Sequence, residues 1–205
     1  MKMYRVNDIF YSLQGEGYHT GRAAVFVRFA GCNLRCPFCD TEFDTFQEMS
    51  ADDILSDIQR HQTSDILPMV VLTGGEPSLQ VDEELIGLLH LHGYYVAMES
   101  NGTRPVPQNL DWLTVSPKGS IKDCGDRLPD ELKIVFDEHT DPEVFLSLVP
   151  HAAIPQQRPT LLFLQPCDTG DAAKNAVITA QCIEYIKRHP KWRLSLQTHK
   201  LAGFK

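Results

Sequence analysis

The sequence predicts an α/β fold, a single domain built as an open, partial (β/α) barrel of about six mostly parallel strands. Short apolar runs rich in β-branched and aromatic residues alternate with segments of helical periodicity. Several of the runs are apolar on both faces, which is typical of buried parallel strands. The 205 residues fall short of the roughly 250 that a complete eightfold barrel needs. We therefore expect one domain over residues 1–205.

Seven runs are the strand candidates. In chain order they cover 23–30, 69–74, 94–100, 112–116, 132–136, 160–166 and, as the weakest candidate, 192–198. Helical periodicity between them predicts helices over 50–61, 82–92, 141–149 and 171–189. The segments 101–111 and 117–130 are polar and broken by proline or glycine, so a full helix is expected in neither.

Charge and hydropathy exclude several classes of partner. A net charge of −8 provides no basic field for a phosphate backbone, so we expect no direct nucleic-acid partner. No run approaches the roughly 20 apolar residues of a membrane span, and the N-terminus lacks the apolar core of a secretory signal. We expect a cytoplasmic protein with a small-molecule partner. In that compartment its six cysteines are thiols or metal ligands rather than disulfides.

Five polar motifs stand where predicted strands end. They are GCNLRCPFCD (31–40), TGGEP (73–77), ESNGT (99–103), SPK (116–118) and QPCD (165–168). The carboxyl ends of parallel strands in such a barrel lie at one rim, where active sites are built. The sequence therefore predicts that these five loops form one site.

Three cysteines in the first of these loops follow the pattern C-x3-C-x2-C: Cys32, Cys36 and Cys39. A [4Fe–4S] cluster normally takes four cysteines, so three leave one iron open for a small molecule. A structural zinc site is an alternative, although neither His19 nor His61 stands at a customary spacing for the fourth ligand. Coincidentally buried core cysteines are a second alternative.

The cysteine pattern together with GGEP after the second predicted strand resembles the radical S-adenosylmethionine (SAM) superfamily. The resemblance implies that the amino and carboxylate groups of SAM chelate the open iron. It also implies that one electron cleaves the sulfonium and that the 5′-deoxyadenosyl radical abstracts a hydrogen atom. The missing fourth ligand would then be SAM.

The resemblance also implies which residues meet this cofactor. Gly74 and Gly75 would approach the SAM amino group, Phe38 would shield the cluster and contact adenine, and Glu99 and Asn101 would reach ribose hydroxyls. The full cofactor-binding set is Phe38, Cys39, Asp40, Gly74, Gly75, Glu99, Asn101, Ser116, Pro117, Lys118, Gln165, Pro166, Cys167 and Asp168. Ordinary turn and loop chemistry is the alternative for each of these motifs.

A closer likeness covers essentially the whole chain. YSLQGEG (11–17), the cysteine loop, TGGEP, SPK and the tail QTHK (197–200) resemble the 7-carboxy-7-deazaguanine synthase family. That family contracts the ring of 6-carboxy-5,6,7,8-tetrahydropterin, with loss of ammonia and regeneration of SAM, in 7-deazapurine and queuosine biosynthesis. The resemblance implies a substrate-contacting N-terminal segment (about 1–22) and tail (about 197–205).

Substrate contacts follow from the likeness and from residue chemistry. Arg28 lies in an apolar run, where a guanidinium is costly unless paired; a substrate carboxylate or a structural ion pair would serve. The remaining expected substrate contacts are Leu13, Gln14, Gly15, Glu16 and Thr73. By resemblance, Thr41 helps to hold Mg²⁺, which binds together with substrate because one hydroxyl is a poor magnesium site. No single general acid or base is assigned.

Partners and rival functions complete the prediction. The family implies a reductant protein such as flavodoxin or ferredoxin, and a homodimer is expected. A glycyl-radical activating enzyme is the nearest rival, since it shares the cysteine pattern. A ferredoxin-like electron carrier or a metal-stabilised binding module would lack catalysis. SLQGEG and Arg28 favour a small acidic ligand over a protein substrate.

Overall fold

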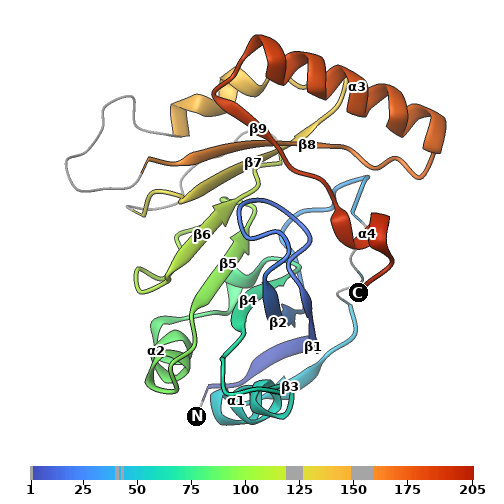
Figure 1. The fold of residues 1–205 in the computed structure, drawn as a ribbon. Helices are drawn as coiled ribbons and strands as arrows, with labels where there is room; N and C mark the ends of the chain where they lie inside the picture. The colour runs from blue at the N-terminus through green and yellow to red at the C-terminus, as the bar shows by residue number, and fades with distance from the viewer. Residues whose placement is uncertain (1, 40–41, 43, 119–126, 149–158) are drawn as a thin grey trace.

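A computed structural model describes residues 2–39, 42, 44–118, 127–148 and 159–205. Its described strands form one nine-stranded sheet in the order β3-β1-β2-β4-β5-β6-β7-β8-β9. Figure 1 shows this sheet twisting from β3 at one end to β9 at the other without closing. The predicted α/β class, with an open and mostly parallel sheet, is confirmed.

Each of the seven predicted runs forms a strand. They are β2 (Ala23–Phe29), β4 (Met69–Gly74), β5 (Val96–Ser100), β6 (Trp112–Val115), β7 (Glu131–Phe136), β8 (Leu161–Pro166) and β9 (Trp192–Leu194), and neighbours among them pair in parallel. Two further strands, β1 (Tyr4–Leu13) and β3 (Gln47–Met49), were not predicted. β1 runs antiparallel to both β2 and β3 and extends the sheet at that end.

Three predicted helices are present: α1 (Ala51–Arg60), α2 (Glu83–Leu91) and α3 (Ala172–Arg188). Each helix is capped at its N-terminus by a short polar side chain, from Ser50, Asp82 and Asp171 respectively. The oxygen of each side chain accepts a hydrogen bond from a free N–H group of the first turn. None of the helices in the described ranges combines the length and the apolar character that a membrane span requires.

The helix expected over 141–149 was wrong in type, because Pro142–Leu148 forms a 3₁₀ segment, η2. A run this short, beginning at a proline, gains too few α-helical hydrogen bonds to offset the cost of nucleation. Two short elements were missed, namely η1 (Pro77–Leu79) and α4 (Thr198–Ala202). No helix forms in 101–111, as expected, and most of 117–130 lies outside the described residues.

The two faces of the sheet have different roles. One face packs against α1, α2 and α3 through a large apolar core that includes Val27, Leu72, Met98, Leu113 and Ile134. Since side chains alternate along a strand, the intervening residues point to the other face, which we call the inner face. Near the strand starts the inner face is apolar and includes Ala24, Val71, Ala97 and Trp112.

Toward the strand ends the inner face becomes polar. Counting by twos from its apolar residues reaches Arg28 on β2, Thr73 on β4, Glu99 on β5, Lys133 on β7 and Gln165 on β8. In the parallel register Arg28 lies opposite Thr73. The period of two thus brings polar groups from five strands to one rim.

The turn after β4 lies directly against the chain that follows β2. The N–H of Gly75 donates to the carbonyl of Phe29 (2.9 Å), and the N–H of Glu76 donates to that of Gly31 (2.9 Å). A Cβ on Gly75 would overlap the backbone carbonyl of Gly31. Glycine is therefore required here for close packing of two backbones, whereas Gly87 in α2 has open space around its Cα.

We predict that Gly75→Ala destabilises the protein and that Gly87→Ala does not. The added methyl group at position 75 forces two backbones apart, which costs about 1–3 kcal/mol. In α2 the same change gains about 0.5–1 kcal/mol from helix propensity. Thermal unfolding followed by circular dichroism checks both, at about 2–4 °C in Tm per kcal/mol. Equal Tm values for the two variants would show that the Gly75 contact is not tight.

Candidate active site

A cavity of about 270 Å³ lies at the carboxyl ends of the parallel strands. Predicted site residues that line it are Glu16, Cys32, Cys36, Phe38, Cys39, Thr73, Gly74, Gly75, Glu99, Asn101, Ser116, Lys118, Gln165, Pro166, Cys167 and Asp168. All five motif-bearing loops therefore reach the same space. Their convergence follows from the parallel topology, which puts every strand end at one rim.

The three clustered cysteines all face this cavity. Burial raises the pKa of the Cys36 thiol, Lys118 opposes that rise, and the neighbouring thiols of Cys39 and Cys32 add to it. Two local hydrogen bonds hold the loop. The N–H of Cys39 donates to the carbonyl of Cys36 (3.1 Å), and the N–H of Leu34 donates to the Cys32 sulfur (3.4 Å). The thiols are thus near enough to interact and share one opening.

Three cysteines at one opening suit a cubane cluster. In a cubane each cysteine binds its own iron, so the sulfurs stand apart, whereas a zinc ion draws four ligands to about 2.3 Å or less. Across the described ranges, no three His, Cys, Asp or Glu side chains come close enough together to hold one ion. The three thiols stand at one opening, as the spacing pattern predicts for residues that share a cluster.

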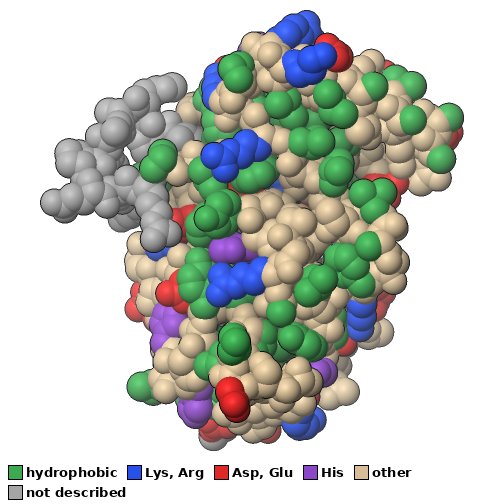
Figure 2. Space-filling view, viewed as in Figure 1, with side chains coloured by type: hydrophobic (Ala, Val, Ile, Leu, Met, Phe, Trp, Pro, Cys, Tyr) green, Lys and Arg blue, Asp and Glu red, His purple; other side chains and the backbone are tan. Residues whose placement is uncertain are grey.

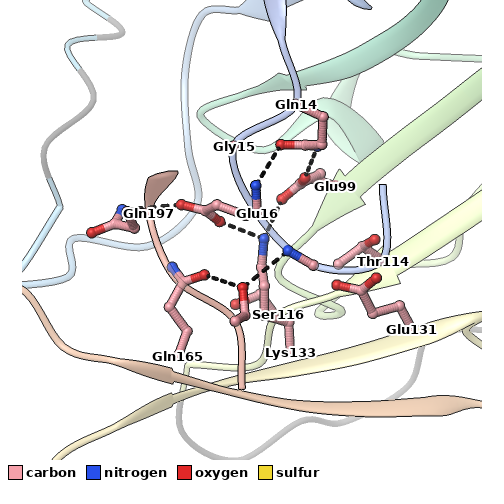
Figure 3. A network of polar contacts seen from close by, with 12 residues as sticks. Gln14, Gly15, Glu16, Glu99, Thr114, Ser116, Glu131, Lys133, Gln165 and Gln197 are labelled. Atoms are coloured by element: carbon pink, nitrogen blue, oxygen red, sulfur yellow. Dashed lines mark hydrogen bonds and ion pairs between the residues drawn. The ribbon is translucent and has the colours of Figure 1, made fainter. Parts of the chain in front are cut away.

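A buried ion-pair network lies beside the cysteines (Figure 3). The Nζ atom of Lys133, whose side chain is 3% exposed, lies 2.5 Å from Glu16 Oε2 and 2.8 Å from Glu99 Oε2. The second oxygen of Glu99 accepts from Gln14 Nε2 (2.8 Å), and that of Glu16 accepts from Gln197 Nε2 (3.0 Å). Three chain segments thus meet at one ammonium group.

The charges in this network act on one another. Burial would raise the pKa of Glu16, but Lys133 and the hydrogen bonds to it lower that pKa to about 2. The same carboxylates hold the pKa of Lys133 above its usual value against the effect of burial. Glu16 and Lys133 are therefore both ionised at neutral pH.

The loop that carries Glu16 is held by the C-terminal segment. The N–H and the hydroxyl of Thr198 both donate to the carbonyl of Gly15 (3.0 and 2.9 Å). The N–H of Gly17 donates to Ser195 Oγ (3.0 Å), which in turn donates to Gln165 Oε1 (2.9 Å). Residues near both ends of the chain therefore position one rim of the cavity.

Glu76 of the TGGEP motif joins the second and third loops. Its fully buried carboxylate accepts from Ser100 Oγ (2.9 Å) and from the N–H of Asn101 (2.7 Å). The Asn101 side chain donates to Asn33 Oδ1 (3.0 Å) in the cysteine loop. Three motifs are thus tied together by hydrogen bonds of buried and part-buried side chains, which keep the rim in one shape.

Lys118 of the SPK motif is a half-buried cation of the cavity. Its ammonium donates to Ser116 Oγ (2.5 Å) and lies 5.7 Å from the centre of the Phe38 ring. Burial and the nearby charge of Lys133 lower the pKa of Lys118 to about 8. A site with two adjacent ammonium groups suits an anionic ligand group.

Some predicted residues lie away from the cavity wall. Leu13, Gln14, Gly15, Arg28 and Pro117 do not line it, although Gln14 reaches it indirectly through Glu99. The Arg28 guanidinium lies over the Phe10 ring (5.1 Å), and no described carboxylate pairs with it. The predicted positions Asp40 and Thr41 lie outside the described residues.

Several residues of the site were not predicted. Lys133, Gln197 and Lys200 line the cavity, and Glu131 lies beneath the loop that carries Glu16. A signal was present for Lys133, because it is a cation within the apolar run LKIVF, like Arg28 in its own run. Gln197 and Lys200 belong to the QTHK tail, which the resemblance implied as a substrate-contacting segment without naming either residue as a contact.

Comparisons with known proteins identify relatives of this chain. The profile of the Radical SAM superfamily matches residues 26–118. The chain is 47% identical over 203 residues to a 7-carboxy-7-deazaguanine synthase of Bacteroides thetaiotaomicron, covering 99% of this chain and 100% of that protein. It is 42% identical to the enzyme of the same name from Nitratidesulfovibrio vulgaris, covering 98% of each. A crystal structure of QueE from Escherichia coli superposes with a TM-score of 0.77 at 30% identity, covering 95% of this chain and 93% of that one.

The raised pKa of Glu131 makes the stability of the folded protein depend on pH. Its buried carboxylate accepts from the Tyr18 N–H (2.9 Å), and burial raises its pKa from the usual 4.5 to about 7. Between pH 4.5 and pH 7 the Glu131 carboxyl is ionised in the unfolded chain but still protonated in the folded protein. The free energy of unfolding therefore falls as pH rises through this range. Above about pH 7 both states are ionised and the cost stays constant.

We expect Glu131→Gln to remove this cost, because an amide oxygen can still accept from Tyr18. Relative to the unmodified protein, its stability should rise by up to about 3 kcal/mol between pH 4.5 and pH 7 and then level off. Tm measured at half-unit pH steps checks the prediction, with the exposed Glu138→Gln as the control for loss of charge. A pH-independent difference in Tm would contradict it.

Proposed function

The chain belongs to the 7-carboxy-7-deazaguanine synthase family of radical SAM enzymes, and we propose that it converts 6-carboxy-5,6,7,8-tetrahydropterin to 7-carboxy-7-deazaguanine with loss of ammonia. One observation carries most of the weight. Three cysteines, the glycine turn and the Glu16–Lys133–Glu99 network line a single cavity. The product would enter 7-deazapurine and queuosine biosynthesis.

The cofactor side of the cavity is proposed to lie along the cysteine loop and β4 to β6. Cys32, Cys36 and Cys39 would hold a [4Fe–4S] cluster, which with SAM supplies the radical that removes hydrogen from the substrate. Gly74 and Gly75 leave backbone exposed to the cavity, and Glu99, Asn101, Ser116 and Lys118 offer polar groups around it. These groups would bind the amino, ribose and carboxylate parts of SAM; Phe38, Asp40, Pro117 and QPCD complete the proposed contacts.

The substrate side is proposed to lie at the loop 13–16 and the ends of β2 and β4. The ionised Glu16 can accept from the amino and ring N–H groups of a pterin. Arg28, on the inner face opposite Thr73, has a planar fork suited to a carboxylate. Together these groups would orient the reacting carbon and exclude water from it.

Further parts of the proposal rest on the family likeness. We propose that Mg²⁺ binds with the substrate at Thr41, that flavodoxin or ferredoxin supplies the electron, and that the protein is a cytoplasmic homodimer. A magnesium ion requires about six oxygen ligands, so one threonine hydroxyl needs substrate oxygens and waters beside it. The domain is proposed to span 1–205, with substrate-contacting segments at about 1–22 and 197–205.

The assignment predicts the behaviour of an arginine variant. With reconstituted cluster, SAM, reductant and Mg²⁺, the chain should form 7-carboxy-7-deazaguanine from 6-carboxytetrahydropterin, detected by mass spectrometry. Arg28→Ala should lower kcat/KM for the pterin by about 30–100-fold, because charged hydrogen bonds worth about 2–3 kcal/mol are lost. Cys36→Ala should abolish product.

Arg22 supplies the matched control, since it also lies over an aromatic ring (Tyr95, 4.6 Å) but is exposed and precedes β2, whereas Arg28 stands near the carboxyl end of that strand. Arg22→Ala should keep normal product formation. Cleavage of SAM to 5′-deoxyadenosine without the 7-deazaguanine product would contradict the substrate assignment and leave the superfamily assignment standing. Absence of both cluster and cleavage would contradict the interpretation of the three cysteines.

Removal of metal should affect one ligand and spare the other. Chelation of Mg²⁺ is expected to raise KM for the pterin at least about tenfold, because the substrate loses a charged partner. SAM binding, measured by equilibrium dialysis, should not change. Restoration of pterin turnover by added Mg²⁺ is the control, and equal loss of SAM binding would place the metal elsewhere.

A further inference from the structure

We propose that Lys133 is a positioning residue that holds the SAM-facing carboxylate of Glu99 and the substrate-facing carboxylate of Glu16 in one geometry. Both ligand subsites would then be built around a single ammonium group. The inference rests on the proposed function, which supplies the ligands of the two carboxylates. Lys133 itself lies in β7, outside all five motifs at the strand ends.

The first support is the geometry at the Lys133 nitrogen. Two carboxylate oxygens, one from Glu16 and one from Glu99, bind it at 2.5 and 2.8 Å. These oxygens can be no more than 5.3 Å apart, which is the sum of the two distances. Figure 3 shows the nitrogen standing between the two side chains. The position of each carboxylate therefore depends on the same atom.

The second support is the way each carboxylate is shared. One oxygen of Glu99 faces Lys133 and the other accepts from Gln14, while one oxygen of Glu16 faces Lys133 and the other accepts from Gln197. Both glutamates also line the cavity. A carboxylate oxygen has two lone pairs, so capacity remains for a ligand. Lys133, Gln14 and Gln197 thus determine which lone pairs of the two carboxylates stay available to a ligand and where those lone pairs point.

The third support is burial. The Lys133 side chain is 3% exposed, and those of Glu16 and Glu99 are 17% and 22% exposed. A buried ammonium group is tolerated only when it is well paired, and removal of one partner leaves uncompensated charge. Glu131 adds a third carboxylate whose charge acts on the ammonium. The site therefore depends on Lys133 to keep two neighbouring negative charges together.

Loss of the ammonium should deform both subsites together. Two carboxylates within about 5 Å repel when nothing positive lies between them, so one turns away or takes up a proton. Neutralising Glu16 in the same protein should remove the repulsion and allow Glu99 to return toward its position. A lysine that only stabilised the fold would show no such restoration.

The experiment measures binding in four variants of the cluster-reconstituted protein. Lys133→Met, Glu16→Gln, the double variant Lys133→Met/Glu16→Gln and Lys133→Arg are compared with the control Lys187→Met, which removes an exposed ion pair on α3. SAM binding is measured by anaerobic equilibrium dialysis. The pterin subsite is probed with 6-carboxypterin, through quenching of its fluorescence. Circular dichroism and iron content confirm that each variant is folded and loaded.

We expect Lys133→Met to weaken the binding of both probes and the double variant to restore the binding of SAM alone. Lys133→Met should raise the Kd of both probes at least about tenfold. The double variant should recover SAM binding to within about threefold of the unmodified protein and not recover 6-carboxypterin, because coupled residues are non-additive. Glu16→Gln alone should weaken only the pterin probe, and Lys187→Met should change neither Kd.

Four results would decide against the proposal or against its premise. Unchanged SAM binding in Lys133→Met, or no recovery in the double variant, would overturn the positioning role. If Lys133→Met does not fold, Lys133→Arg provides the test. The guanidinium places its N–H donors at other positions than the ammonium, so the binding of both SAM and 6-carboxypterin should weaken. Undiminished binding of both would overturn the proposal. Failure of 6-carboxypterin to bind the unmodified protein would contradict the proposed substrate, and the SAM measurements would still decide the role of Lys133.

Discussion

The alternation of side chains along parallel strands determines which groups meet in this protein. Every second residue of a strand faces the helices and must be apolar, so only the other set is free to carry chemistry. Parallel pairing then brings the ends of these strands to one rim. Arg28, Thr73, Glu99, Lys133 and Gln165 come from five strands yet share one face for this reason. Figure 2 shows Lys and Arg side chains at several separate places on the face that it draws, with apolar and other groups between them.

Charge balance inside the cavity follows from that arrangement. The inner face brings in acidic and basic side chains together, and neither sign is stable alone in a buried position. Lys133 is paired with Glu16 and Glu99, whereas Lys118 has a hydroxyl partner and a pKa lowered to about 8 by burial and by Lys133. Lys133, which has two carboxylate partners, therefore stabilises the structure of the site. Lys118, which has only a hydroxyl partner among these contacts, is more available to an anionic ligand group.

Local sequence patterns predicted the strands and the motif-bearing loops but not the parts made by distant segments. Apolar runs and strand-end motifs are local, so all seven runs and most cavity residues could be predicted. β1 alternates apolar and polar residues less regularly, with Asn7 and Asp8 at its bulge, and was missed. Gln197 and Lys200 reach the cavity because the C-terminal segment folds back; the resemblance implied a contact from this tail, but no local pattern identified the individual residues. Lys133 was the exception, since a cation in an apolar strand could have been noticed.

The open edge of the sheet explains why both ends of the chain reach the site. β3 and β9 are the two edges of the described sheet and do not pair with each other, and the C-terminal segment that follows β9 reaches β1 and its loop through individual hydrogen bonds and an ion pair. Thr198 donates to Gly15, Gln197 to Glu16, and Lys205 pairs with Asp8 (2.7 Å). Each such bond contributes about 0.5–1.5 kcal/mol, far less than a continuous strand ladder. The buried pair of Glu16 with Lys133 joins this edge to β7 as well, so the loop that carries Glu16 is held both by the C-terminal segment and by the sheet, and its position depends on the two together.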